Sequence, residues 1–480
     1  MAAATPYFKE SQVSGFGMGL ALLVLVAFGA ASGVMIAMGE LQALYVCLSL
    51  LACTAVLYDF RVGAVLLVIL LPFSASSVFP HELMGIRGLN PINLLVLGTL
   101  GSFLLHGRVG YNGTVVPKPL MWLYIVPIVL GGLLGMRHVD DIFPYFYEMM
   151  AVDFTTPVSY LRDMVVKPML IVIVAMMIAV AVAKSQKPER FLAPIVISIW
   201  VVSLLEIIFV IVSGVPLGQL AGSGAARGFF LAIGMHANDL GRLFLVAYSL
   251  MLFTWWEAKD PRFKLVLFLT LGVISLALLL TFSRGAFVGF LLVNTLFLMW
   301  KFNARTLGLA ILAAVVVVSF APGYLYRRIT VGFDSGSVDD VSAGRVEGIW
   351  APLLPTIWDS PVWGKGIGST MWSDPMVTES MEPVTHPHNA YLEAVLDLGF
   401  LGLAALLLFY WKVLQGFRAL GSHAYLSPVL RGFFQGATAG LIGFFVTGWA
   451  GSTLMPRYEW VFLWVAIGMM YGMLARRPAG

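Results

Sequence analysis

Long apolar runs recur along almost the whole chain, and they restrict the fold more than any single motif does. Each run has about 20 residues, the length that crosses the hydrocarbon core of a bilayer as a helix. About fourteen such runs are present, and they begin near Ser14, Leu41, Gly63, Asn90, Pro119, Lys167, Phe191, Gly228, Phe263, Gly285, Thr306, Ala390, Gly432 and Trp460. The pattern predicts an all-α, polytopic integral membrane helix bundle of about 12 to 14 transmembrane helices with one large loop outside the membrane.

The composition excludes a soluble protein. Hydrophobic residues make up 60% of the chain and charged residues only 11%, whereas soluble domains carry roughly 25% charged residues. The net charge of +4 gives no reason to expect a nucleic-acid partner, because in a membrane protein the position of each basic residue matters more than the sum. Cys47 and Cys53 lie on different sides of one helix, so they predict neither a disulfide nor a metal site.

Lysine and arginine in the short loops predict the orientation, because they favour the cytoplasmic side of a membrane. We expect both termini in the cytoplasm and the long polar loop on the opposite face. Four parts follow from this order: N-terminal transmembrane helices at 1–226, core helices with outer-face arginines at 227–321, the large outer loop at 322–389, and C-terminal helices at 390–480.

Two arginines at the outer ends of apolar runs are candidates for binding an anion. Arg284 lies in a short turn between two such runs, and Gly285 beside it permits the close approach of backbone or ligand, which favours function over a mere helix anchor. Arg227 precedes the eighth run and has no local acidic partner. By contrast, Asp239 and Arg242 are spaced to neutralise each other on one helical face inside the bundle.

The long outer loop contains two further elements. Residues 344–350 form a short amphipathic helix by their pattern, and Arg345 in it is either an exposed, solvated charge or a functional group. Residues 361–368 contain three glycines in a tight turn. This spacing superficially resembles a phosphate-binding loop, but the strand and helix that such a loop needs are missing, so a nucleotide site is not expected.

Histidines stand where this loop enters the twelfth apolar run. Pro387 disfavours helical geometry at His386, so His386 belongs to the loop, while His388 and Asn389 start the helix. The positive end of a helix favours anions and keeps a nearby imidazole neutral, ready to act as a base. Arginine is suited to phosphate because its planar fork provides paired, permanently charged donors. Together these residues fit a transfer from a lipid diphosphate.

The order and spacing of these elements resemble the O-antigen ligase and polymerase superfamily. The resemblance is carried by Ser283–Ala286, Gly344–Arg345 with Trp350, the turn 361–368, and His388–Asn389 with Gly399. It implies that Arg284 and Arg345 are essential and that His388 is the catalytic residue. We also expect Arg227, His386 and Asn389 to bind substrate. Family ligases commonly have about twelve spans. The larger number predicted here keeps a polymerase as an alternative to a ligase.

The resemblance further implies a glycosyltransferase of the bacterial inner membrane with its active site on the periplasmic face. The donor would be a glycan on undecaprenyl diphosphate, and the acceptor a hydroxyl of the lipid A core or of a growing glycan such as an exopolysaccharide. Neither metal nor cofactor is expected, since arginines can stabilise the leaving diphosphate. The alternative is a transporter or flippase of lipid-linked glycans, but internal repeats are absent and the polar cluster lies at the outer surface.

Overall fold

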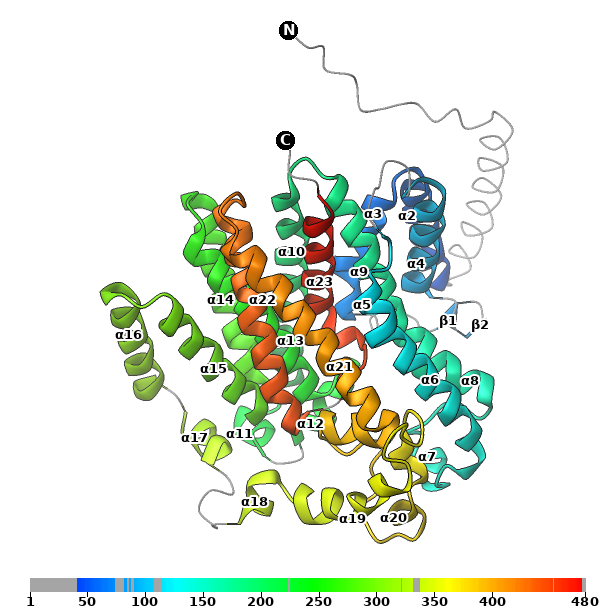
Figure 1. Cartoon of the computed structure of the whole chain (residues 1–480). Coiled ribbons are helices and arrows are strands. Elements are labelled where there is room, and N and C mark those ends of the chain that lie inside the picture. Colours follow the sequence, from blue (N-terminus) through cyan, green and yellow to red (C-terminus); the bar gives the residue numbers. More distant parts are fainter. Residues whose placement is uncertain are drawn as a thin grey trace.

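The structure is a computed structural model that describes residues 41–73, 82–83, 86–87, 90–107, 114–222, 225–320, 322–330, 337–451 and 453–476. The first predicted span, near Ser14, lies outside the described residues. The described chain is a bundle of helices (Figure 1) with one short antiparallel pairing, in which Glu82 lies opposite Arg87.

The elements follow one another in the order expected from the apolar runs. Those before residue 225 are α2 (Leu41–Tyr58), α3 (Phe60–Leu70), β1 (Glu82–Leu83), β2 (Ile86–Arg87), α4 (Pro91–Ser102), α5 (Lys118–Leu120), α6 (Val126–Gly135), α7 (Tyr145–Glu148), α8 (Pro157–Leu161), α9 (Lys167–Lys184), α10 (Leu192–Ser213) and α11 (Leu217–Leu220). Those after it are α12 (Ala225–Leu231), α13 (Ala237–Glu257), α14 (Pro261–Leu280), α15 (Arg284–Trp300), α16 (Ala304–Phe320), α17 (Gly323–Thr330), α18 (Val338–Ser342), α19 (Ala351–Leu353), α20 (Asp374–Val377), α21 (Ala390–Ser422), α22 (Pro428–Thr447) and α23 (Val461–Ala475). The short 3-10 and π-helical segments are η1 (Leu71–Phe73), η2 (Phe103–Gly107), η3 (Met121–Ile125), η4 (Met136–Asp141), η5 (Arg162–Val166), η6 (Pro188–Phe191), η7 (Val346–Trp350), η8 (Pro355–Asp359), η9 (Ser369–Trp372), η10 (Gly448–Ala450) and η11 (Tyr458–Trp460).

Several helices begin with a capping residue followed by proline. Asn90 accepts from the backbone of Asn93 before α4, and Asp260 accepts from the backbone of Arg262 before α14. The cap satisfies a backbone N–H that the helix leaves open, and proline tolerates the first turn because its missing N–H is not needed there. These local signals, rather than the apolar runs alone, determine where the helices start.

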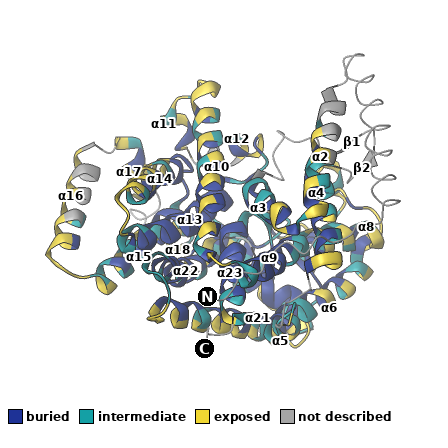
Figure 2. Ribbon diagram, turned by 90° about the horizontal axis from the view of Figure 1, so that it is seen from above, coloured by how far each residue is buried: buried dark blue, intermediate teal, exposed yellow. Residues whose placement is uncertain are grey.

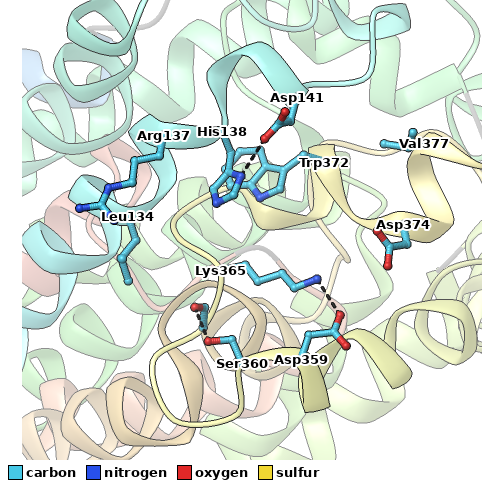
Figure 3. A pocket seen from close by; sticks show the side chains of 11 residues that line it. Leu134, Arg137, His138, Asp141, Asp359, Ser360, Lys365, Trp372, Asp374 and Val377 are labelled. Atoms are coloured by element: carbon cyan, nitrogen blue, oxygen red, sulfur yellow. Dashed lines mark hydrogen bonds and ion pairs between the residues drawn. The ribbon is translucent and has the colours of Figure 1, made fainter.

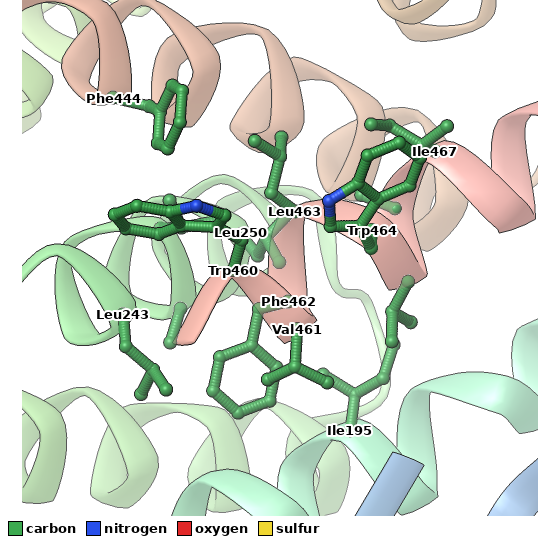
Figure 4. Close-up of a cluster of buried hydrophobic side chains, with 14 of the residues drawn as sticks. Ile195, Leu243, Leu250, Phe444, Trp460, Val461, Phe462, Leu463, Trp464 and Ile467 are labelled. Carbon is green, nitrogen blue, oxygen red and sulfur yellow. The ribbon is translucent and has the colours of Figure 1, made fainter. Parts of the chain in front are cut away.

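The centre of the bundle consists of α9, α13, α22 and α23. Helix α13 packs along α22, and α9 packs along α23, and these helices are the most buried in Figure 2. Bulky apolar side chains from α10, α13, α22 and the last helix meet in this core (Figure 4), among them Ile195, Leu243, Phe444 and Trp464. The predicted parts 227–321 and 390–480 therefore contribute helices to one bundle.

Among the residues that the structure describes, seven helical segments are long and apolar enough to cross a membrane: Lys118–Asp141, Pro157–Lys184, Pro188–Ser213, Pro261–Leu280, Ala390–Ser422, Pro428–Ala450 and Tyr458–Ala475. The chain is thus a polytopic helical membrane protein, while the number of 12 to 14 spans stays a prediction. One predicted boundary is wrong. The span expected from Gly228 starts at Ala237, because a turn with Gly234 at φ +82° separates it from α12 and His236 caps the new helix.

The turn 361–368 is a wedge between two helices. A Cβ at Gly366 would collide with the backbone of Gly135 on α6, and one at Gly364 with the backbone of Asp397 on α21. Helix α21 bends at Gly399, whose φ is +69°, and the N–H of Phe400 donates to the carbonyl of Pro361 instead. The glycines are therefore required for backbone packing, which agrees with the absence of a nucleotide-binding pattern.

The described part of the large loop, α17 to α20, lies at the end of the bundle opposite to the C-terminus (Figure 1). We expect a cysteine at Ser380, which is exposed in the loop, to react with a membrane-impermeant maleimide while the inner membrane is intact. A cysteine at Tyr425, 94% exposed between α21 and α22, should react only after permeabilisation. Ser373 is unsuitable because it is only 2% exposed. The reverse labelling pattern, in a background without Cys47 and Cys53, would contradict the predicted orientation.

Candidate active site

The large loop returns to the bundle through three residues with distinct geometries. Pro387 has no N–H, His388 has a left-handed backbone with φ of +54°, and Asn389 caps α21. The side-chain oxygen of Asn389 accepts from the N–H groups of Tyr391 and Leu392 at 3.0 and 3.1 Å. A left-handed histidine is strained, and such strain concentrates at functional sites. The predicted start of the helix is confirmed, although His388 directly precedes the cap instead of opening the first turn.

His386 lies beside His388, with 4.3 Å between the ring centroids. Burial lowers the pKa of the His386 imidazole well below its ordinary value, and electrostatic interactions with His388, Arg457, His236 and Arg345 lower it further. Groups from the loop, from the cap of α13 and from the segment before η11 therefore act on a single imidazole. They lie together although they are far apart in the sequence, and His386 is held neutral among them.

Replacement of His386 by glutamine is expected to make the protein less sensitive to acid. The folded-state pKa is lowered from 6.5, so the unfolded chain binds the proton more readily once the pH falls through the unfolded value. Above a pH of about 6.5, His386 is neutral in both states and does not change the stability. Below that pH only the unfolded chain gains the proton readily, so the folded protein loses stability. When the pH is lowered from roughly 7.5 to 5, the unfolding temperature in detergent should fall further for the wild type than for His386→Gln. Equal losses would contradict the lowered pKa of His386 in the folded protein.

Arg345 is buried, with only 8% of its surface exposed, so the reading as an exposed, solvated charge is wrong. Its Nη1 donates to the carbonyl of Ala450 at 3.1 Å, in η10 after the end of α22. The same loop segment makes a second contact through Trp350, whose indole N–H donates to the carbonyl of Pro387 at 2.8 Å. These contacts hold the helical segment 346–353 of the loop against both the histidines and the bundle.

Arg284 is the first residue of α15 and is half-buried. The cap of this helix, Ser283, donates its hydroxyl to the side-chain oxygen of Asn238 in the first turn of α13 at 2.9 Å. The starts of α13 and α15 are therefore in contact. A Cβ at Gly285 would meet no described atom within 4 Å, so no close backbone approach explains this glycine. Access for a ligand remains the predicted reason for it.

Three helices thus begin close to one another at the end of the bundle that carries the large loop. Helix α13 begins after His236, α15 after Ser283, and α21 after Asn389. The N-terminus of a helix carries unpaired N–H groups and a partial positive charge, so it attracts anions. Together with Arg284 and Arg345, these helix starts make the site suited to a phosphate-containing ligand.

Arg457, which directly precedes η11, does not stand out in the sequence from the other basic residues of the loops. Burial lowers the pKa of Arg457, but the carboxylates of Asp239, Glu459 and Glu393 outweigh this effect and raise it above its ordinary value. The side chain therefore joins α13, α21 and η11 by charge. One signal could have identified it: acidic and basic residues at the start of an apolar run are rare unless they face the bundle interior.

Arg242 is buried as predicted, but Asp239 is not its only neighbour. The guanidinium stacks over the ring of Trp460 at 4.1 Å and over that of Phe444 at 4.6 Å. Its Nε donates to the hydroxyl of Thr447 at 3.2 Å. This side chain fastens α13 to α22 and η11 beneath the site, so its role is structural.

The structure says little about substrate binding by two of the predicted residues, Arg227 and Asn389. Arg227 lies in α12, next to α13, and its side chain is outside the described part of the chain. The side-chain oxygen of Asn389 is used as the helix cap. Among the described residues, no group of three or more His, Cys, Asp or Glu side chains is arranged to hold a metal ion.

Residues 266–407 match the model of a family described as O-Antigen ligase. This confirms the resemblance found in the sequence. The matched region runs from α14 into α21 and contains Arg284, Arg345, His386 and His388, while Asp239 and Arg457 lie outside it. No curated protein matches the chain.

Proposed function

We propose, from the match of residues 266–407 to the O-Antigen ligase family, that this membrane protein transfers a glycan from undecaprenyl diphosphate to an acceptor hydroxyl on the periplasmic face of the inner membrane. The family supports a membrane glycosyltransferase of the ligase or polymerase type. The acceptor would be the lipid A core or a growing glycan.

The observation that carries the proposal is the set of cationic groups around the two histidines. Arg345 and Arg457 both lower the pKa of the His386 imidazole, next to the helix starts described above. A diphosphate already carries charge before the reaction, so fixed donors that stabilise it as it leaves are sufficient for departure. Arg284 and Arg345 would hold this diphosphate. Catalysis without a metal stays part of the proposal.

His388 would act as the general base. The acceptor hydroxyl gives its proton to the imidazole while its oxygen attacks the anomeric carbon. The bond from that carbon to the diphosphate breaks, and undecaprenyl diphosphate leaves with the electron pair. Attack opposite to the leaving group inverts the anomeric centre. The strained backbone of His388, fixed between Pro387 and the Asn389 cap, would keep the imidazole in place.

A transfer assay in detergent micelles separates this function from transport. The purified full chain is mixed with lipid-linked glycan and acceptor, and the product is detected as an acceptor of lower gel mobility. Without a bilayer a transporter produces nothing, whereas a transferase forms the new glycosidic bond. Folded protein that yields no product, yet moves the donor across the bilayer of proteoliposomes, would refute the transferase and establish the transporter.

A further inference from the structure

A cavity of about 680 Å³ opens on the same end of the molecule as the large loop, between the α6–η4 segment and the loop (Figure 3). Its walls carry basic, acidic and aromatic side chains, and the residues that matter for its chemistry are Arg137, His138, Asp141, Asp359, Lys365, Trp372 and Asp374. Its volume is within the roughly 300–1,000 Å³ of small-molecule sites. None of the candidate catalytic residues lines it.

The wall carries both hydrogen-bond donors and acceptors. The ammonium of Lys365 lies 2.7 Å from a carboxylate oxygen of Asp359, and Nδ1 of His138 lies 2.9 Å from a carboxylate oxygen of Asp141. Arg137 adds further donors and Asp374 adds an acceptor. Such a wall does not favour an apolar ligand, and its three carboxylates oppose a purely anionic one. A chain of hydroxyl groups, each both donor and acceptor, matches it.

Trp372 supplies a second, independent indication of a ligand. Its indole is only 7% exposed, and Nε1 donates to no acceptor among the described residues. In Figure 3 this nitrogen lies on the side of the ring that faces Lys365. The imidazole of His138 stacks on the indole at 5.5 Å. A buried donor without a partner is costly, and a ligand hydroxyl in the cavity would satisfy it.

Hydrogen bonds join the cavity wall to α21, the helix that begins directly after the Asn389 cap. Ser369 donates from its backbone and its hydroxyl to the Asp397 carboxylate at 3.0 and 2.7 Å. The N–H of Lys365 donates to the carbonyl of Leu396 at 2.8 Å. Asp397 follows the first residue of α21 by seven positions, so this anchor between the loop and α21 lies about 10 Å along the helix from its start.

We propose that this cavity is a glycan-binding subsite, which holds a polyhydroxyl segment of the acceptor chain some sugars away from its reacting end. The identification of the bound glycan as the acceptor rests on the proposed function, whereas the binding of a glycan in the cavity does not. A subsite at this distance binds the remote part of the substrate and thereby positions the reacting hydroxyl.

Binding is tested in the His388→Ala background, so that no transfer occurs. The probes are oligosaccharides released from the surface polysaccharide of the source cell, and affinity for the purified full chain is measured by calorimetry. Arg137→Ala with Asp374→Ala should weaken binding about tenfold or more, the effect of losing a charge-assisted hydrogen bond. The matched controls Arg162→Ala with Asp140→Ala, which change charges outside the cavity, should bind normally.

A second variant tests the cavity without removing charge. Val377 lines it and is exposed, so Val377→Trp should fill the opening, abolish binding and leave the unfolding temperature unchanged. Wild-type affinity in both cavity variants, or no binding by the parent protein, would overturn the subsite. If binding behaves as expected while the transfer assay yields no product, the proposed function fails and the subsite stands.

Discussion

His388→Ala should transfer glycan at no more than about one hundredth of the wild-type rate, because general-base catalysis contributes a hundredfold or more. The backbone at this position is left-handed and is fixed by the helix cap that follows it. Alanine keeps the fold but removes the proton acceptor. Donor binding, carried by the arginines, should remain near the wild-type affinity.

The neighbouring histidine is the matched control for this variant. His386→Ala should retain substantial activity, since the strongly lowered pKa of His386 makes its imidazole a poor proton acceptor. Initial rates across pH, with purified protein and lipid-linked donor, measure both variants. A His388→Ala protein that works at nearly the wild-type rate would reassign catalysis to departure of the diphosphate driven by the arginines.

Arg345→Lys should lose transfer almost as completely as Arg345→Ala. The guanidinium bridges the loop to Ala450, and its planar fork can hold a phosphate through paired donors, whereas lysine keeps the charge and loses the fork. The loss of a charge-assisted hydrogen bond in a buried site amounts to about 1.5–3 kcal/mol, or roughly tenfold to a hundredfold in rate. Arg284→Lys is expected to behave in the same way.

The control for both arginines is Arg162→Ala. Arg162 pairs with Asp163 at 2.9 Å in η5, and its loss should leave transfer unchanged because exposed pairs contribute little. Rates are compared at equal amounts of folded protein. Normal transfer by either lysine variant would refute the bidentate role of that arginine.

Much of the fold follows from local sequence. The apolar runs correspond to helices throughout the described chain, since backbone groups in lipid must be satisfied within each segment. Caps such as Asn389 determine helix starts, and the three glycines between Pro361 and Ser369 indicate a tight turn. The span expected from Gly228 was wrong because an apolar turn has the same hydrophobicity as an apolar helix.

The composition of the site was harder to predict. Arg284 and the histidines stand out because they border apolar runs, and Arg345 because it lies in a short amphipathic helix of the polar loop. Arg457 acts through Asp239, which is more than 200 residues earlier in the chain, and no local pattern indicates such a pair. The burial of Arg345 likewise depends on the distant end of α22. The packing of α13 against α22 and η11, and the contact of the loop with η10, bring these groups together.

The most direct test of the central claim is to follow both products of one turnover in proteoliposomes that contain the purified protein, lipid-linked glycan and acceptor. The account predicts that wild-type protein releases undecaprenyl diphosphate in equal amount to the new glycosidic bond, with inversion at the anomeric carbon, and that His388→Ala does neither although it binds the donor. Retention of the anomeric configuration, or bond formation by His388→Ala at the wild-type rate, would contradict it.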